Sequence, residues 1–147
     1  MRFAIVLALL VSLQGCSFAH PLHGDITFTP EERAAIERGD ALIADRVGRD
    51  PVGVVWDAPH PIDDQPEGPC VQGTIIRTKG IGGSHRRGCL RIGTDDPAYF
   101  ERVATHELGH WYGLCHHDGP GIMNDAVTSA EWTIEDEASK HVRSCVR

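Results

Sequence analysis

The chain has 147 residues, which is enough for one domain with a buried core and too few for several. Its formal net charge is −7, and this acidic balance excludes nucleic acid as a general partner. Aromatic residues make up only 6% of the chain, so disulfides worth about 2 to 4 kcal/mol each would add appreciably to the stability of the domain.

The amino terminus is typical of an export signal. Arg2 precedes an apolar run over residues 3–13 that is too short to span a bilayer as a permanent helix. Leu13-Gln14-Gly15-Cys16 then resembles the lipobox of bacterial lipoproteins, in which cleavage occurs before the cysteine and the cysteine is lipidated. We therefore expect a signal peptide over residues 1–15 and a flexible, lipidated tether over residues 16–29 that holds the protein on a membrane.

The destination of the exported chain depends on where the signal is cut. Ser17 follows the cysteine, where lipoproteins retained in the inner membrane carry aspartate, and this favours the outer membrane or the cell surface. Cleavage after Ala19 is the alternative, because Ser17-Phe18-Ala19 is an acceptable small-residue site. That cleavage would leave the protein periplasmic or secreted.

A helix and three strands are expected in the next part of the chain. Thr29-Pro30-Glu31-Glu32 combines an N-cap, a proline at the first helical position and a capping glutamate, and it predicts an amphipathic helix ending at Gly48. Apolar and β-branched segments between turn residues predict strands over 51–56, 73–79 and 88–92. Residues 57–69 read as a proline-rich, acidic surface loop, and residues 80–85 as a flexible connection.

Two further helices are expected towards the carboxyl terminus. Asp96-Pro97 predicts the start of a helix with an apolar stripe along one face. Thr133-Ile134-Glu135-Asp136 is a second capping box and predicts a final helix to about Val142.

Residues 106–116 follow the pattern H-E-x-x-H-x-x-G-x-x-H, which is typical of a catalytic zinc site. On a helix, His106 and His110 stand on one face a single turn apart, where both imidazoles can reach one tetrahedral ion. Glu107 is angled off the metal axis and suits a general base that acts on a water at the metal. Gly113 suits a left-handed helix end, which turns the chain so that His116 becomes the third ligand.

The histidine motif, followed by Met123 in a glycine- and proline-containing turn, resembles the signature of the metzincin zinc peptidases. The short gap between His116 and Met123 is most similar to the matrixin branch. The resemblance implies an α+β, zincin-like catalytic domain over residues 30–147, with a twisted mixed sheet, an N-terminal helix, an active-site helix and a C-terminal helix after the Met-turn. It also implies one Zn²⁺ ion above Met123 and a substrate lying extended against the edge strand, taken to be residues 88–92.

The function expected from these residues is that of a zinc-dependent endopeptidase acting on a protein or peptide substrate. Glu107 would take a proton from the attacking water and pass it to the leaving amine. We expect a monomer. Two alternatives stay open, namely a non-catalytic module stabilised by zinc, which would have no reason to carry Glu107, and a lipid-anchored binding protein without zinc.

Other residues compete for roles at this site. Glu131 is an alternative third ligand, at the distance that other zincins use. His117 ranks below His116 as a ligand and would be either a hydrogen-bond donor behind the ligands or an exposed residue. Cys115 could ligate zinc in place of its neighbour. Met123 could be an ordinary core residue.

Four cysteines remain after Cys16 is assigned to the lipobox, and an even number in an oxidising compartment predicts two disulfides. Three connectivities are possible. We favour Cys70 with Cys89, across the glycine-rich middle of the chain, and Cys115 with Cys145, which would brace the third ligand.

Residues 77–91 are locally basic. Two interpretations stay open: a preference for acidic side chains near the cleaved bond, and a solvated basic surface on an acidic protein. The basic residues are Arg77, Lys79, Arg86, Arg87 and Arg91.

Overall fold

The computed structural model describes residues 21–58, 71–79, 82–86, 88–116 and 121–124. Several expectations lie outside these ranges: the signal peptide and Cys16, most of the acidic loop, the predicted final helix, and the side chains of Cys70, His117, Glu131 and Cys145. Among the described residues, no helix has the length and apolar character needed to cross a membrane.

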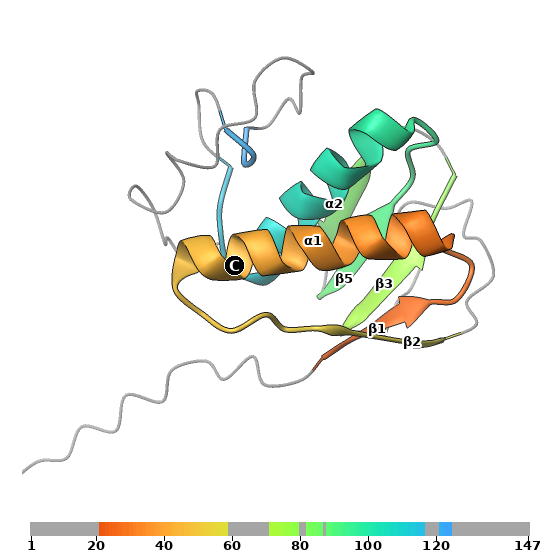
Figure 1. Cartoon of the computed structure of the whole chain (residues 1–147), viewed down its shortest axis with the longest axis horizontal. Coiled ribbons are helices and arrows are strands. Elements are labelled where there is room, and N and C mark those ends of the chain that lie inside the picture. The colour runs from red at the N-terminus through yellow and green to blue at the C-terminus, as the bar shows by residue number, and fades with distance from the viewer. Residues whose placement is uncertain (1–20, 59–70, 80–81, 87, 117–120, 125–147) are drawn as a thin grey trace, which may run out of the picture.

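The described chain forms a five-stranded mixed sheet and two helices, which places it in the α+β class (Figure 1). The strands lie in the order β2-β1-β3-β5-β4; the first four are parallel, and β4 runs antiparallel to β5. Along the chain, the elements are β1 (Leu22–Asp25), α1 (Pro30–Val47), β2 (Val54–Ala58), β3 (Thr74–Arg77), β4 (Gly83–Arg86), β5 (Cys89–Ile92) and α2 (Pro97–Trp111).

The first helix begins and ends as the sequence predicts. The hydroxyl of Thr29 accepts the backbone N–H of Glu32 at 3.2 Å, and the carboxylate of Glu32 accepts the backbone N–H of Thr29 at 2.9 Å. At the other end Gly48 has a φ of +67°, the left-handed conformation that glycine adopts without a steric penalty. The prediction of α1 is therefore confirmed, including the capping residues that bound it.

The folded domain begins earlier in the chain than expected. Leu22–Asp25 form β1, which lies between β2 and β3, and Leu22 is completely buried. The expectation of a flexible tether up to residue 29, with the domain beginning at residue 30, is therefore wrong from Leu22 onwards. A four-residue strand that contains histidine and glycine shows no β-type pattern of its own, and its place is set by its two neighbouring strands.

The predicted flexible connection also contains a strand. Gly83–Arg86 form β4, an edge strand with β5 on its inner side, so residues 88–92 are not the edge strand that the sequence suggested. Polar and glycine residues weaken any strand signal here, and the pairing with β5 decides the conformation.

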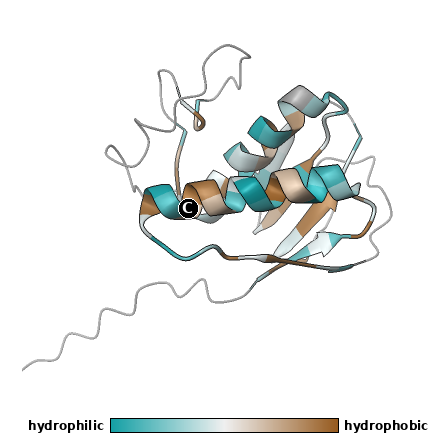
Figure 2. Cartoon of the chain, in the orientation of Figure 1, coloured by the Kyte–Doolittle hydropathy of each residue, from teal (hydrophilic) through white to brown (hydrophobic). Residues whose placement is uncertain are grey.

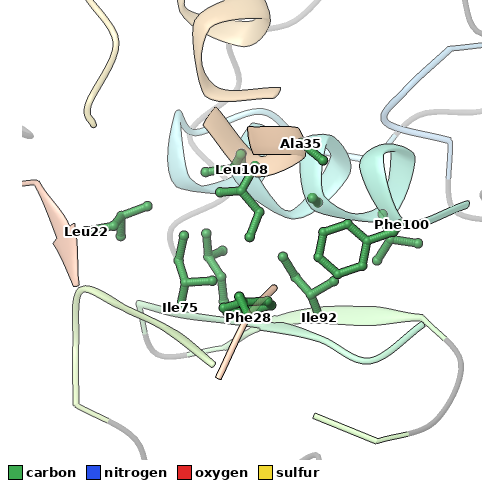
Figure 3. Close-up of a cluster of buried hydrophobic side chains, with 11 residues drawn as sticks. Leu22, Phe28, Ala35, Ile75, Ile92, Phe100 and Leu108 are labelled. Atoms are coloured by element: carbon green, nitrogen blue, oxygen red, sulfur yellow. The ribbon is translucent and has the colours of Figure 1, made fainter. Parts of the chain in front are cut away.

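The core lies between the sheet and the two helices. Hydrophobic and hydrophilic segments alternate along α1 (Figure 2), and this helix lies beside α2 over the sheet (Figure 1). Figure 3 shows side chains of α1 and α2 meeting those of β3 and β5. The buried cluster consists of Leu22, Phe28, Ala35, Ile36, Ile75, Leu90, Ile92, Phe100, Val103, Ala104 and Leu108.

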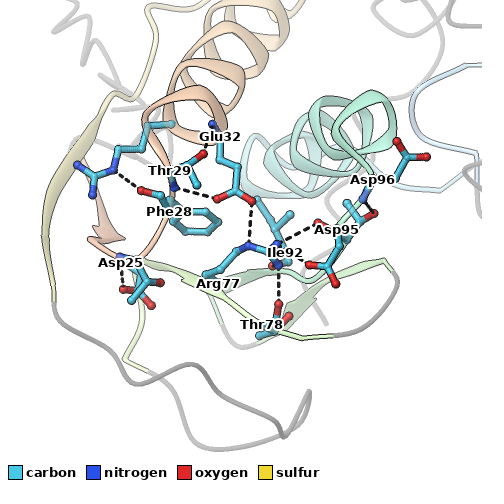
Figure 4. A network of polar contacts seen from close by, with 12 residues as sticks. Asp25, Phe28, Thr29, Glu32, Arg77, Thr78, Ile92, Asp95 and Asp96 are labelled. Carbon is cyan, nitrogen blue, oxygen red and sulfur yellow. Dashed lines mark hydrogen bonds and ion pairs between the residues drawn. The ribbon is translucent and has the colours of Figure 1, made fainter.

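Arg77 at the end of β3 joins this sheet to the starts of both helices (Figure 4). Its guanidinium donates to the carboxylate of Glu32 at 3.1 Å and to that of Asp95 at 2.8 Å. It also donates to the carbonyl oxygens of Thr78 and Thr94. The side chain is only 14% exposed, so Arg77 is a structural cross-link and cannot belong to a solvated basic surface.

Candidate metal centre

Three imidazole rings converge at the carboxyl end of α2. The Nε2 atom of His116 lies 3.0 Å from Nε2 of His106 and 2.9 Å from Nε2 of His110. In a tetrahedral zinc site, Zn–N distances of about 2.0 to 2.1 Å separate the nitrogens by ~3.3 Å. The three nitrogens therefore need to move apart by only a few tenths of an ångström to hold a metal ion, and they form the group in the described chain that could do so.

Backbone carbonyls orient two of these rings. Nδ1 of His106 lies 2.6 Å from the carbonyl oxygen of Ile122, and Nδ1 of His110 lies 3.0 Å from that of Leu114. Because a carbonyl only accepts, each Nδ1 must carry the proton, and each Nε2 then presents a lone pair to the centre. Converging lone pairs repel one another, so this arrangement of donors suits a bound cation.

The turn after α2 places the third histidine. Gly113 has a φ of +86°; its N–H donates to the carbonyl of His110, and the N–H of Leu114 donates to that of Gly109, both at 2.9 Å. These two bonds form a Schellman motif, which ends the helix and reverses the chain. The predicted role of Gly113 as the turn residue is confirmed, and His116 lies beside the other two imidazoles as a result.

Met123 lies directly under the histidine helix. It is completely buried, and its Sδ atom would be 2.4 Å from a Cβ atom placed on Gly109. The methionine thus fills the space that a side chain at position 109 would occupy, one residue before His110. Sequence reasoning did not single out Gly109, although a glycine inside a helix is a signal of close packing.

Glu107 is buried next to His106 and against the edge strand. The residue is 4% exposed, and a Cβ atom on Gly83 of β4 would lie 2.7 Å from its Oε1 atom. Its Oε2 atom is buried and makes no hydrogen bond to the described residues. Burial disfavours the charged form and raises the pKa of Glu107 to about 8.

Burial has the opposite effect on the nearby imidazoles. Burial lowers the pKa of His110 to about 4, and the neighbouring histidines lower it further. The hydrogen bond to the carbonyl of Leu114 acts in the opposite direction, because it favours the charged form. The ring therefore stays neutral over the physiological range, as a metal ligand must.

A fourth histidine lies over the site. The ring of His85 in β4 stacks on that of His110, with centroids 5.7 Å apart and planes at 21°, and it meets the ring of Trp111 edge to face at 6.3 Å. Burial lowers the pKa of His85. The sequence did not indicate this residue, because residues 80–85 were expected to form a flexible connection. The side chain of His85 is directed to the site only because these residues form β4.

The described cysteines are oxidised. Cys89 and Cys115 are both disulfide-bonded, so Cys115 has no thiolate to offer a metal and its candidacy as a ligand is wrong. The Sγ atom of Cys89 lies 3.0 Å from the carbonyl oxygen of Val71. The favoured pairings of Cys70 with Cys89 and of Cys115 with Cys145 stay predictions, since Cys70 and Cys145 lie outside the described ranges.

The predicted basic surface is smaller than its sequence suggests. Arg91 is 2% exposed and Arg77 is held in ion pairs, so neither can meet a substrate in solvent.

No family model, curated protein or solved structure matches this chain. Its function is therefore inferred from the residues and geometry of the metal centre itself.

Proposed function

We propose that the protein is a zinc-dependent endopeptidase of the metzincin type. The observation that carries the proposal is the convergence of the Nε2 atoms of three histidines next to a buried glutamate that ligates nothing. A module that used zinc only for stability would gain nothing from an unpaired carboxylate in its interior, because burying such a group costs free energy. The carboxylate is best explained by a chemical role.

The edge strand supports the same function. The antiparallel pairing of β4 with β5 begins at Gly83 opposite Ile92, and just before it the carbonyl of Gly82 accepts the N–H of Gly93 at 2.8 Å. In an antiparallel ladder, every second residue of a strand directs its backbone N–H and C=O groups to the neighbouring strand. The backbone groups of Ser84 therefore face β5, whereas those of Gly83 and His85 point away from the sheet. An extended peptide can pair with these outward groups and so lie along β4 beside the metal centre.

The chemistry follows from the positions of the side chains. When bound by the three histidines, zinc would lower the pKa of a water ligand to about 7 and polarise the peptide carbonyl. Glu107 would accept the proton of the attacking water on its carboxylate and deliver it to the leaving amine. The carbonyls of Ile122 and Leu114 hold the imidazoles of His106 and His110 in the tautomer that this arrangement needs.

Export is part of the proposal. Disulfides form in oxidising compartments, and the bonded state of Cys89 and Cys115 supports a periplasmic, surface or secreted enzyme. We propose attachment to a membrane through a lipid at Cys16. Replacement of Cys16 by serine should move the protein from the membrane fraction to the soluble fraction, whereas an unchanged distribution would contradict the anchor.

The decisive experiment combines metal analysis with a peptidase assay. The purified protein should contain one zinc ion per chain and cleave casein or a quenched peptide, and a chelator should abolish cleavage until zinc is returned. Glu107→Ala and Glu107→Gln should retain the metal and lose at least ~10²-fold in kcat, as expected for removal of a general base.

The outcomes separate the competing functions. Stoichiometric zinc without cleavage of any peptide would indicate a zinc-stabilised module, and absence of zinc would indicate a binding protein of another kind. Full activity in Glu107→Gln would refute the assignment of the base.

A further inference from the structure

Gly83 in β4 has no conformational reason to be a glycine. Its φ is not among the positive values found at other glycines, in contrast to Gly82, whose φ is +106°. Glycine weakens a strand, because it loses more freedom on folding than other residues and has no side chain to pack. An explanation for Gly83 must therefore come from the space around it.

That space is occupied by the catalytic glutamate. A Cβ atom on Gly83 would lie 2.6 Å from Cγ and 2.7 Å from Oε1 of Glu107, and 2.8 Å from Cγ1 of Val103. All three distances are shorter than real Cβ atoms tolerate. Since Gly83 is paired with Ile92 of the core, its missing side chain belongs to the sheet face that α2 covers.

We propose that Gly83 is a positioning residue that sets the distance between the catalytic base and the substrate. This inference rests on the proposed peptidase function. The α-carbon face of Gly83 is the surface against which the carboxylate of Glu107 packs, while its outward N–H and C=O groups are among those that would pair with a bound peptide. One residue thus contacts both the base and the peptide whose bond is broken.

The packing against Gly83 matters because little else holds the carboxylate. Oε2 of Glu107 has no hydrogen-bond partner in the described chain, so no polar contact of this atom would restore its position after a displacement. A methyl group at position 83 would overlap both the side chain of Glu107, whose carboxylate end is flexible, and that of Val103, which is buried in the core at 2% exposure. The glutamate is the easier of the two to move.

The test is Gly83→Ala, measured by kinetics, metal titration and structure. We expect kcat to fall by about 10- to 100-fold, since a displacement of about 1 Å can cost 10²-fold, while KM and zinc affinity change by less than ~3-fold. A crystal structure of the zinc-free variant should show the Glu107 carboxylate displaced from β4, a result that does not depend on activity.

Three further variants distinguish this mechanism from a general disturbance of α2. Gly39→Ala places a Cβ atom 2.6 Å from the hydroxyl of Thr105 and so presses on the same helix from α1; it should lower stability and leave kcat unchanged. Gly83→Ala should cost much less in a Glu107→Ala background, whose side chain lacks both the Cγ and the Oε1 atoms that a Cβ atom on Gly83 would meet. Adding Val103→Ala to Gly83→Ala should restore little activity.

Two results would overturn the inference: a kcat for Gly83→Ala within ~3-fold of wild type, or recovery of kcat on adding Val103→Ala. Neither resembles failure of the proposed function, which would appear as absence of cleavage by the zinc-loaded wild-type enzyme. In that case Glu107 has no role as a base and the positioning role falls with it.

Discussion

The hydroxyl of Tyr112 is at the centre of a buried polar network next to the metal centre. It donates to the carboxylate of Asp40 in α1 and accepts the backbone N–H of Val52 at 2.9 Å. Asp40 also accepts the N–H of Gly53 at 2.8 Å. Asp40 is 2% exposed and Tyr112 is 4% exposed. The network therefore joins α1 and the segment just before β2 to Tyr112, the residue that precedes Gly113.

Replacing Tyr112 by phenylalanine removes this hydroxyl without creating a cavity. Asp40 keeps two backbone N–H donors, so its charge is still partly satisfied. The loss is one hydrogen bond to a charged group, worth about 1.5 to 3 kcal/mol. We therefore expect Tyr112→Phe to lower the free energy of unfolding by about 2 kcal/mol.

Urea denaturation of the wild type, Tyr112→Phe, Asp40→Asn and the double variant measures this contribution. Each single change already breaks the Tyr112–Asp40 hydrogen bond. The double variant should therefore lose roughly 1 to 2 kcal/mol less free energy of unfolding than the two single variants lose together. Additive effects, or a loss below about 0.5 kcal/mol for Tyr112→Phe, would refute the view that this network stabilises the fold.

The same network predicts an alkaline limit to stability. Burial, with the Asp40 carboxylate as a further cause, raises the pKa of Tyr112 above its ordinary value of 10.0. A group whose pKa is raised in the folded state contributes stability below its unfolded pKa and loses it as the pH rises further. Wild-type stability should therefore decline above about pH 10 more steeply than that of Tyr112→Phe, and parallel profiles would contradict this.

Two further predictions concern the support of the ligands. Met123→Ala should lower the free energy of unfolding by about 2 to 5 kcal/mol, because it empties a fully buried space beside Gly109; a loss below 1 kcal/mol in urea denaturation would show that the methionine is not an essential part of this packing. Gly113→Ala forces a φ of +86° on a residue with a Cβ atom and should cost about 1 to 2 kcal/mol; zinc affinity, measured by chelator competition, should fall as His116 shifts, and unchanged affinity would contradict the role of the turn.

Local sequence patterns predicted α1, α2 and the grouping of the three histidines well. A capping box and a terminal glycine are interactions between residues three or four apart, so α1 could be bounded from Thr29 and Gly48 alone. The spacing of His106 and His110 on a helix has one geometric outcome for the same reason. Gly113 marked the turn, and the position of His116 followed from it.

Local patterns failed where contacts between distant residues decide the outcome. β1 and β4 are four-residue strands containing glycine and histidine, and only their neighbours in the sheet make them strands. The predicted tether therefore extended too far into the domain, and β5 was predicted to be the edge strand in place of β4. His85 was missed with β4, because a side chain can be assigned to a face only when its strand and register are known.

The amino-acid sequence by itself determined which groups come together at the candidate metal centre, since the three histidines and Glu107 lie within eleven residues of one helix and one turn. Only the tertiary structure decided what surrounds them. The edge strand that brings Gly83 against Glu107, the carbonyl of Ile122 that orients His106, and the packing of Met123 on Gly109 all join segments that are separated in the chain. Helical spacing is fixed by bonds between near neighbours, whereas the order of strands in a sheet and the packing of a core depend on contacts across the whole domain.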